Sequence, residues 1–312
     1  MNEFQLIKTF FTREEIRNNV KIGIGDDGAV LSSKQNQDLV VVTDTLVAGV
    51  HFFDEQPASA LGYKTLSVNL SDLAAMGAEP DWVTLNLVLP EANSSWLKEF
   101  SRGFFDLADR YSVALVGGDT NRGPLSVTAT AGGWVPRDQA NCRSEAKIGD
   151  LIYVSGTLGD AALGLNLLKK KKISIDDENN YFLKRLMCPE PRISLGQLLR
   201  PVASAVIDIS DGLISDLGHV TTASGSLGAV IYEHLIPIHS AAIEYCEHSE
   251  ILEMALSGGD DYELCFTVAP NNQKDVERLE AELDLSLTLI GHIDAVSGVR
   301  VFDEDHACRE ID

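Results

Sequence analysis

The chain has 312 residues, 45% of them hydrophobic, and 25 Lys and Arg against 47 Asp and Glu give a formal net charge of −22 at pH 7. This length predicts two domains, and so acidic a protein is unsuited to nonspecific binding of nucleic acid or of an anionic membrane. The five cysteines lack any C-x-x-C pair, and no apolar run reaches the roughly eighteen residues of a membrane span, which predicts a cytoplasmic protein in a reducing compartment.

The first half of the chain alternates strand-like and helix-like stretches. The N-terminal residues 1–11 predict a short amphipathic helix with Phe4, Ile7, Phe10 and Phe11 facing inward. Strands are predicted at 39–43, 82–89, 113–116 and 125–135, and helices at 57–76 and 93–111. Helical spacing predicts two core stripes, one of Leu66, Leu70 and Leu73 and one of Trp96, Phe100, Phe104 and Leu107.

The polar stretch 136–150 has no apolar periodicity and separates two segments that each begin with a strand. We therefore predict an N-terminal domain at 1–138 and a C-terminal domain at 139–312. The second half predicts strands at 151–155, 205–209, 229–232, 263–268 and 287–293, and helices at 160–170, 181–187, 193–199 and from 212 onward. The predicted fold class is α/β (α+β), with two mixed α/β domains.

Six short acidic clusters are the most informative feature of the sequence. They are GDD (25–27), TDT (43–45), NLSD (69–72), GGDT (117–120), DISD (208–211) and GGDDYE (258–263), and most follow an apolar, strand-like run. Two carboxylates 4 Å apart repel by about 4 kcal/mol at an effective dielectric near 20, so their convergence predicts cations between them. Hard oxygen ligands indicate Mg²⁺ together with phosphate oxygens, and hence phosphoryl transfer.

The GIGDDGAV segment at 23–30 matches two glycine-rich nucleotide loops, but its context excludes both. The residues that follow are strand-like rather than helical, and the chain has no H-R-D, D-F-G or Walker A sequence. The segment predicts a turn that exposes Asp26 and Asp27, at least one of which reaches a metal. An ordinary polar turn is the alternative.

The other clusters also have structural alternatives. Asp44 and Asp119 are typical of strand-end turns as well as of metal sites, whereas Asp72 lies mid-helix in an apolar stretch where a carboxylate needs partners. Asp208 and Ser210 share one face of a strand, and Asp211 suits a helix N-cap. For two further residues both readings stay open: Arg143 suits a phosphate clamp or a surface arginine, and His51 a substrate contact or a structural histidine.

Seven segments, taken in order, resemble thiamine-monophosphate kinases across nearly the whole chain. They are GIGDD, TDTLVAGVHF, YKTLSVNLSDLAAMGAEP, GGDTNRGPLS, CRSEAKIGD, IDISDGLISDLGH and LSGGDDYELCF. This family is grouped with aminoimidazole-ribonucleotide synthetase and selenophosphate synthetase in one ATP-dependent superfamily. Selenophosphate synthetase uses an early cysteine or selenocysteine, whereas the first cysteine here is Cys142.

The resemblance implies transfer of the ATP γ-phosphoryl group to thiamine monophosphate with several Mg²⁺ ions. It implies these metal ligands: Asp27, Val42 (through its carbonyl), Thr43, Asp44, Asp72, Asp119, Asp208 and Asp211. Asp44, Asp72 and Asp119 would carry catalysis. ATP would contact Gly118, Asp119, Arg143 and Ser210, and the thiamine phosphate would contact His51 and Asp260.

The family pattern and this sequence differ at two places. Asp260 stands where the family commonly has glutamate, and the family's C-terminal aromatic residue has no match in the final residues, Cys308 to Asp312. The family also forms homodimers whose N-terminal sheets join into a barrel, which would cover the edges of the strands at 82–89 and 125–135. The alternatives are another enzyme of the superfamily with a different acceptor, or a noncatalytic Ca²⁺-binding protein, although the chain has no EF-hand loop.

Overall fold

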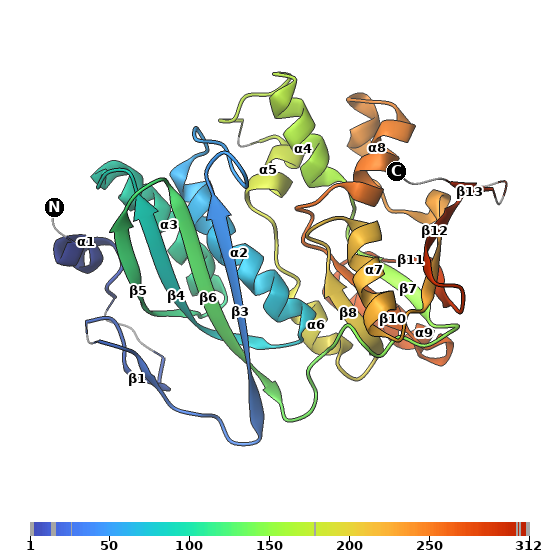
Figure 1. Ribbon diagram of the computed structural model, residues 1–312, viewed down its shortest axis with the longest axis horizontal. Coiled ribbons are helices and arrows are strands. Elements are labelled where there is room, and N and C mark those ends of the chain that lie inside the picture. Colours follow the sequence, from blue (N-terminus) through green and yellow to red (C-terminus); the bar gives the residue numbers. More distant parts are fainter. Residues whose placement is uncertain are drawn as a thin grey trace. The chain divides into compact units, whose positions relative to one another are not determined.

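The computed structural model describes residues 3–13, 17–25, 27–177, 179–303, 305 and 307–309. The chain divides into two compact units, one of Met1–Leu73 with Ala78–Asp138 and one of Ala74–Gly77 with Gln139–Asp312. Each unit combines helices with its own main sheet, so the predicted mixed α/β class is confirmed (Figure 1). None of the helices in the described ranges has the length and apolar character needed to cross a membrane.

A four-stranded sheet of order β3-β6-β4-β5 forms the N-terminal unit. Its strands are β3 (Gln37–Val47), β4 (Glu79–Leu89), β5 (Ala114–Arg122) and β6 (Ser126–Pro136). β3 and β4 run antiparallel to β6, and β5 runs parallel to β4. Because successive side chains of a strand point to opposite faces, one face of this sheet is apolar and buried while the other carries many threonines.

Helices α2 (Ala58–Ala75) and α3 (Ser94–Arg110) cover the apolar face (Figure 1). Both predicted stripes are confirmed as core, except that Trp96 is only half-buried. The two helices approach very closely at glycines: a Cβ on Gly103 would lie 1.8 Å from the carbonyl oxygen of Ser59, and one on Gly62 would lie 2.1 Å from that of Phe100. The helix that carries Asp72 is therefore packed backbone to backbone against α3.

An N-terminal segment precedes this sheet, with α1 (Glu3–Phe10) followed by a small antiparallel hairpin of β1 (Val20–Ile22) and β2 (Val30–Leu31). α1 contributes Leu6 to the core, and Phe11 just after it is buried; Ile7 and Phe10 of the predicted inward face are half-buried, and the Phe4 side chain lies outside the described set.

The base of the hairpin is held by the buried carboxylate of Asp81 in β4, which is 1% exposed. Its Oδ1 accepts from Arg17 Nη1 at 2.6 Å and pairs with Lys34 Nζ at 3.4 Å, and its Oδ2 accepts from Asn19 and from Trp134 Nε1 at 3.0 Å. Arg17 and Asn19 precede β1, and Lys34 follows β2, so both ends of the hairpin are attached to one side chain.

The C-terminal unit has a seven-stranded sheet of order β13-β12-β9-β11-β7-β10-β8. Its strands are β7 (Leu151–Ser155), β8 (Ala203–Asp208), β9 (Gly228–Tyr232), β10 (Leu264–Val268), β11 (Leu287–Asp294), β12 (Gly298–Phe302) and β13 (Cys308–Arg309). The pairing of β12 with β9 is parallel, and the other pairings are antiparallel. Every residue of β10 is buried, because it lies between β7 and β8 with both faces covered.

Helices lie on both faces of this sheet. They are α4 (Asp160–Lys169), α5 (Tyr181–Met187), α6 (Ile193–Leu199), α7 (Leu213–Ala223), α8 (His248–Ser257) and α9 (Gln273–Leu283), with 3₁₀ turns η1 (Glu233–Leu235), η2 (Ser240–Glu244) and η3 (Pro270–Asn272). Apolar residues of α7 and α8 pack on one face, against a core that includes Ile152, Val154 and Ile207. α9 packs with α6 and β11.

The strands β3 and β5 continue well past their predicted C-terminal ends. The strands expected to end at residues 43 and 116 continue to Val47 and Arg122, because β3 keeps its pairing with β6 and β5 keeps its pairing with β4. Asp44 and Asp119 therefore lie inside strands, and the prediction that they occupy strand ends is wrong.

Candidate active site

Two predicted metal ligands of the N-terminal unit meet directly. Asp44 of β3 and Asp72 of α2 are half-buried, and their side chains share a hydrogen bond. Burial raises the pKa of Asp44; the hydrogen bond to Asp72 and positive charge on His51 oppose that rise. Two carboxyl groups at hydrogen-bond distance need either a proton or a cation between them at neutral pH.

The neighbours of Asp44 on β3 point to different faces of the sheet. Val42 shares the face of Asp44, whereas Thr43 faces the opposite side, where its hydroxyl lies 3.0 Å from Thr130 Oγ1 and 3.1 Å from the carbonyl oxygen of Ala129. The hydroxyl of Thr43 is therefore bound to β6 rather than turned toward Asp72. His51, after β3, accepts from the N–H of Val47 at its Nδ1, at 3.0 Å.

A second pair of predicted ligands lines one pocket of about 440 Å³ in the same unit. Asp27, from the turn between β1 and β2, and Asp119, from β5, both contribute to its wall together with Gly118. Asp26, the other aspartate predicted for this turn, lies outside the described residues. The pocket brings together two acidic clusters that are about 90 residues apart in the sequence.

The second glycine of GGDT, Gly118, has a structural purpose that the sequence did not indicate. Gly118 has a φ of +146°, and a Cβ there would lie 1.8 Å from the carbonyl oxygen of Leu85 on β4. The close approach is thus between β5 and its neighbouring strand. Asp119 next to it accepts from Thr120 N at 2.9 Å and from Asn121 Nδ2 at 2.5 Å, which fixes the direction of its carboxylate.

In the C-terminal unit the DISD and GGDDYE clusters lie side by side. The N–H of Asp260 donates to the carbonyl oxygen of Ser210 at 2.9 Å, and that of Tyr262 donates to Ile209 at 2.8 Å. A Cβ on Gly259 would lie 2.5 Å from the same Ser210 oxygen, which explains the glycine there. Ser210, predicted to bind ATP, and Asp260, predicted to bind the thiamine phosphate, are therefore backbone neighbours.

Asp208 and Asp211 flank this contact. Asp208 ends β8 and is 3% exposed, whereas Asp211 is exposed in the turn before α7. Asp211 was predicted to cap α7, but the N-cap residue is Gly212. The turn is held instead by Asp216, whose Oδ2 accepts from the N–H groups of Ser210 and Asp211, both at 3.0 Å.

Asp216 is a residue that the sequence analysis missed. It is 3% exposed, and burial raises its pKa, against the two backbone hydrogen bonds. Its only sequence signal was an acidic residue within the apolar helix pattern that follows Gly212. Arg143, the predicted ATP clamp, is exposed, and its carbonyl oxygen accepts from Ser224 Oγ at 3.2 Å.

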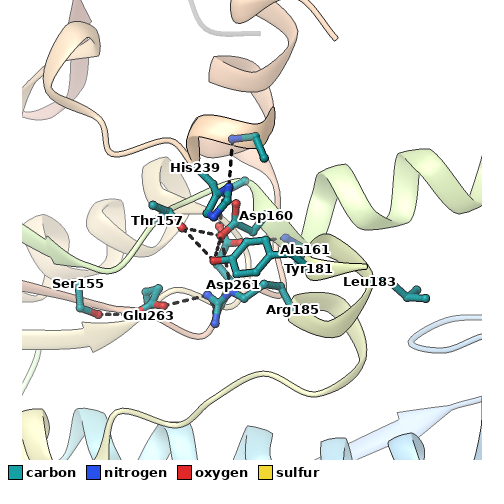
Figure 2. Close-up of polar contacts among 12 residues, drawn as sticks. Ser155, Thr157, Asp160, Ala161, Tyr181, Leu183, Arg185, His239, Asp261 and Glu263 are labelled. Atoms are coloured by element: carbon teal, nitrogen blue, oxygen red, sulfur yellow. Dashed lines mark hydrogen bonds and ion pairs between the residues drawn. The ribbon is translucent and has the colours of Figure 1, made fainter. Parts of the chain in front are cut away.

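Two residues of the GGDDYE loop belong to a cluster of buried charges that the sequence analysis did not identify (Figure 2). It contains Asp160, Asp261 and Glu263, which are 2%, 1% and 0% exposed, together with the guanidinium group of Arg185. Burial raises the pKa of Asp261 to about 7, although hydrogen bonding to Gly159 N–H and the charge of Arg185 oppose the shift. Burial also raises the pKa of Asp160, and Thr157, Arg185 and Tyr181 oppose it.

The described residues contain no ready-made group of three His, Cys, Asp or Glu side chains that could hold a metal ion. They do contain the hydrogen-bonded pair of Asp44 and Asp72, and the two aspartates that share the pocket, Asp27 and Asp119. These hard oxygen donors fit Mg²⁺, which commonly takes one or two carboxylates from the protein and its other ligands from water and phosphate. The donor set therefore suits magnesium that arrives with a nucleotide.

Comparisons with known proteins place the chain in a family. The AIR synthase related protein N-terminal domain matches residues 25–135, and the corresponding C-terminal domain matches residues 147–304. The thiamine-monophosphate kinase of Buchnera aphidicola (strain APS) is 46% identical to this chain over 306 residues, which cover 96% of this chain and 94% of the relative. The thiamine-monophosphate kinase of Escherichia coli K12 is 48% identical over 295 residues, which cover 94% of this chain and 90% of the relative. The chain belongs to the thiamine-monophosphate kinase family.

Solved structures of this family have the same fold. The thiamine-monophosphate kinase of Stenotrophomonas maltophilia K279a superposes with a TM-score of 0.90 at 47% identity, covering 96% of each chain. AaThiL complexed with AMPPCP and TMP superposes with a TM-score of 0.78 at 30% identity, covering 99% of this chain and 93% of that one. The family resemblance predicted from the sequence is thus confirmed.

Proposed function

We propose that this protein catalyses the ATP-dependent phosphorylation of thiamine monophosphate to thiamine diphosphate. The observation that carries the proposal is the match, over 94% of the chain and at 48% identity, to the thiamine-monophosphate kinase of Escherichia coli, in a fold shared with a relative that binds AMPPCP and TMP. The adjacent aspartates Asp44 and Asp72 and the pocket of Asp27 and Asp119 supply the acidic oxygens that such a reaction needs.

In this proposal, the residues of each unit have separate roles. In the N-terminal unit, metal is held by Asp27, the carbonyl of Val42, Thr43, Asp44, Asp72 and Asp119, while Gly118 and Asp119 contact ATP and His51 contacts the thiamine phosphate. In the C-terminal unit, metal is held by Asp208 and Asp211, ATP by Arg143 and Ser210, and the thiamine phosphate by Asp260. The Thr43 hydroxyl is bonded to β6, so binding of metal through this hydroxyl requires that bond to break.

The chemistry requires little of these residues beyond alignment. The acceptor is a phosphate oxygen whose second pKa is about 6, so it is ionised near pH 7 and needs no general base. Bound Mg²⁺ would neutralise charge on the two phosphate groups. The aspartates fix where that charge is neutralised.

We also propose that the protein forms a homodimer. Leu39 and Val41, on the threonine-rich face of the edge strand β3, are 46% and 54% exposed. A second copy of the same sheet would cover these apolar side chains and the unpaired strand edge. Sedimentation at micromolar concentration tests this, and a monomer would contradict the dimer without affecting the proposed activity.

Chromatographic detection of thiamine diphosphate tests the activity itself. The protein is incubated with ATP and Mg²⁺, and with either thiamine monophosphate or unphosphorylated thiamine. We expect product from the monophosphate only. We further expect Asp44→Asn or Asp119→Asn to lower turnover by about 10² or more, because each substitution removes a charge that stabilises the transition state.

Asp38→Asn is the matched control, since Asp38 lies on the same strand as Asp44, is exposed, and accepts from the N–H of Asp138 at 2.8 Å. It should leave turnover unchanged. No product from thiamine monophosphate with a folded protein would refute the proposed function, and normal turnover in both active-site variants would refute the assigned ligands.

A further inference from the structure

The loop at 258–263 between α8 and β10 carries two buried carboxylates, Asp261 and Glu263, next to Asp260, which the proposed function assigns to the substrate. Asp261 and Glu263 point into the C-terminal unit and are 1% and 0% exposed, while Asp260 between Gly259 and Asp261 is half-buried. Buried carboxylates are costly unless they are fully paired, so their contacts indicate what the loop is attached to.

Glu263 binds three side chains from three different elements. Its Oε1 accepts from Arg185 Nη2 at 2.8 Å, and its Oε2 accepts from Ser155 Oγ at 2.5 Å and from Arg192 Nε at 2.7 Å. A second nitrogen of Arg192 also reaches Oε1, so this arginine is bidentate. Burial opposes the charge on Arg192, but the carboxylate of Glu263 outweighs it and raises the pKa of Arg192.

Asp261 attaches the same loop to the start of α4. Its Oδ2 accepts from Gly159 N at 2.7 Å and its Oδ1 accepts from Ala161 N at 3.2 Å. The carbonyl oxygen of Asp261 accepts from Arg185 Nη2 at 2.9 Å. Arg185 therefore binds the loop through the carbonyl oxygen of Asp261 and the carboxylate of Glu263, and Figure 2 shows its guanidinium group next to Glu263.

The loop backbone is strained between these attachments. Asp260 and Tyr262 are non-glycine residues with φ of +70° and +52°, in the left-handed region that is unfavourable for residues with a side chain. A conformation of this kind persists only where its surroundings determine it, and here the buried carboxylates alternate with the two strained residues. The Tyr262 hydroxyl then donates to Asp260 Oδ1 at 3.2 Å, and the Asp260 N–H donates to Ser210.

We propose that Glu263, through Arg185 and Arg192, is a positioning residue that holds the strained loop so that Asp260 is presented to the phosphorylated substrate. This inference rests on the proposed function and on the role given there to Asp260. Glu263 itself is fully buried and acts only through the loop. The three donors that bind it come from β7, α5 and the residue before α6, so the loop is set by the core of the unit.

Glu263→Gln tests the proposal, because the amide keeps the shape of the side chain but loses its charge and one acceptor. We expect the KM for thiamine monophosphate to rise by about ten- to a hundredfold, as for the loss of one or two hydrogen bonds to a charged group, with a smaller change in kcat. Asp150→Asn is the control: Asp150 is 4% exposed and accepts from Lys147 N and Ser204 Oγ at the other end of β7. It should lower thermal stability while leaving that KM within about twofold.

Amide hydrogen exchange gives a readout that does not depend on the reaction. The Asp260 and Tyr262 N–H groups should exchange at least about tenfold faster in Glu263→Gln than in Asp150→Asn. Unchanged exchange at these amides, or an unchanged KM in a folded Glu263→Gln, overturns the positioning role. If the wild type makes no thiamine diphosphate, the proposed function fails, and exchange alone decides whether Glu263 holds the loop.

Arg192→Lys is a milder variant in case Glu263→Gln does not fold. Arg192 is 20% exposed at its side chain, and lysine keeps its charge while losing the bidentate contact. It should show the same two effects at a reduced size, and normal exchange and KM in this variant would also overturn the proposal.

Discussion

Replacing Asp81 by asparagine should destabilise the N-terminal unit by about 3 kcal/mol. The side chain is 1% exposed and receives hydrogen bonds from Arg17, Asn19 and Trp134 as well as an ion pair from Lys34. An amide offers one acceptor oxygen and turns an NH₂ group toward donors on its other side. At least one donor that is now satisfied would lose its acceptor.

The magnitude follows from how far each donor can reach water. Breaking a buried ion pair costs about 3–5 kcal/mol, but the Arg17 and Lys34 side chains are 23% and 29% exposed and can be partly hydrated instead. Trp134 is 7% exposed, and an unsatisfied indole N–H there costs about 1–3 kcal/mol. Together these contributions give about 3 kcal/mol, a large part of the stability of an ordinary domain.

Tryptophan fluorescence during urea denaturation reports this unit selectively, because the three tryptophans, Trp82, Trp96 and Trp134, all lie in it. With a slope of about 1–3 kcal/mol per molar urea, the expected midpoint shift is roughly 1–3 M. Asp109→Asn is the matched control, since Asp109 pairs with Arg13 at 2.5 Å but is 65% exposed, and it should cost at most about 1 kcal/mol. Equal shifts in the two variants would refute the argument from burial.

The free energies of unfolding of the wild type and of Asp81→Asn should become more similar in acid. Burial alone would raise the pKa of Asp81, but the hydrogen bonds and the charge of Lys34 outweigh it and lower that pKa below the ordinary value of 3.8. A carboxylate with a lowered pKa stabilises the folded state above its unfolded pKa and loses that contribution as the pH falls through the folded value. The difference between wild type and Asp81→Asn should therefore shrink below pH 3.8, and a constant difference would contradict the assignment.

Two further predictions concern packing and pH. Gly103→Ala should destabilise the protein by about 1–3 kcal/mol, because the new Cβ would lie 1.8 Å from the carbonyl oxygen of Ser59. Gly218→Ala should stabilise the protein by about 1 kcal/mol, because Gly218 lies mid-helix and a Cβ there would have nothing within 4 Å. Thermal unfolding measures both effects, and equal effects would contradict the role of the Ser59 contact. The pKa of Asp261 is raised from 3.8 to about 7, so protonated Asp261 stabilises the folded wild type at low pH and this contribution is lost as the pH rises through that interval. Between pH 4 and pH 8 the stability of Asp261→Asn relative to wild type should therefore increase by up to about 4 kcal/mol. Denaturant titrations at both pH values measure that gain, and a difference that does not change with pH would exclude titration of Asp261 in this range.

Periodicity was enough to predict the elements that carry the acidic clusters. The stripe of Phe100, Phe104 and Leu107 gave α3 to within one residue at each end, and the apolar run before Ser155 gave β7 as observed. The ends of β3 and β5 were wrong because TDT and GGDT are polar, and a polar segment continues as a strand only when its neighbour supplies hydrogen bonds. α8 and α9 were not predicted, since much of each faces solvent.

The pairing of residues distant in the sequence could not be predicted in the same way. The proximity of Asp44 to Asp72 was expected, because both are carboxylates in acidic clusters. The proximity of Asp260 to Ser210 depends on the pairing of β10 with β8, which no local pattern predicts. Glu263 was read only as part of an acidic run. Its burial against Arg192 follows from long-range packing that no local pattern encodes.

The order of strands in the C-terminal sheet has a consequence for synthesis of the chain. β7 lies between β10 and β11, and the N–H of Leu264 meets Ser155 Oγ across 109 residues. The sheet of the N-terminal unit is complete once residue 136 has left the ribosome, whereas β7 must wait for both of its neighbours. A nascent chain stalled between residues 160 and 260 would therefore expose the apolar strand Leu151–Ser155, and this interval is where a chaperone would be most needed.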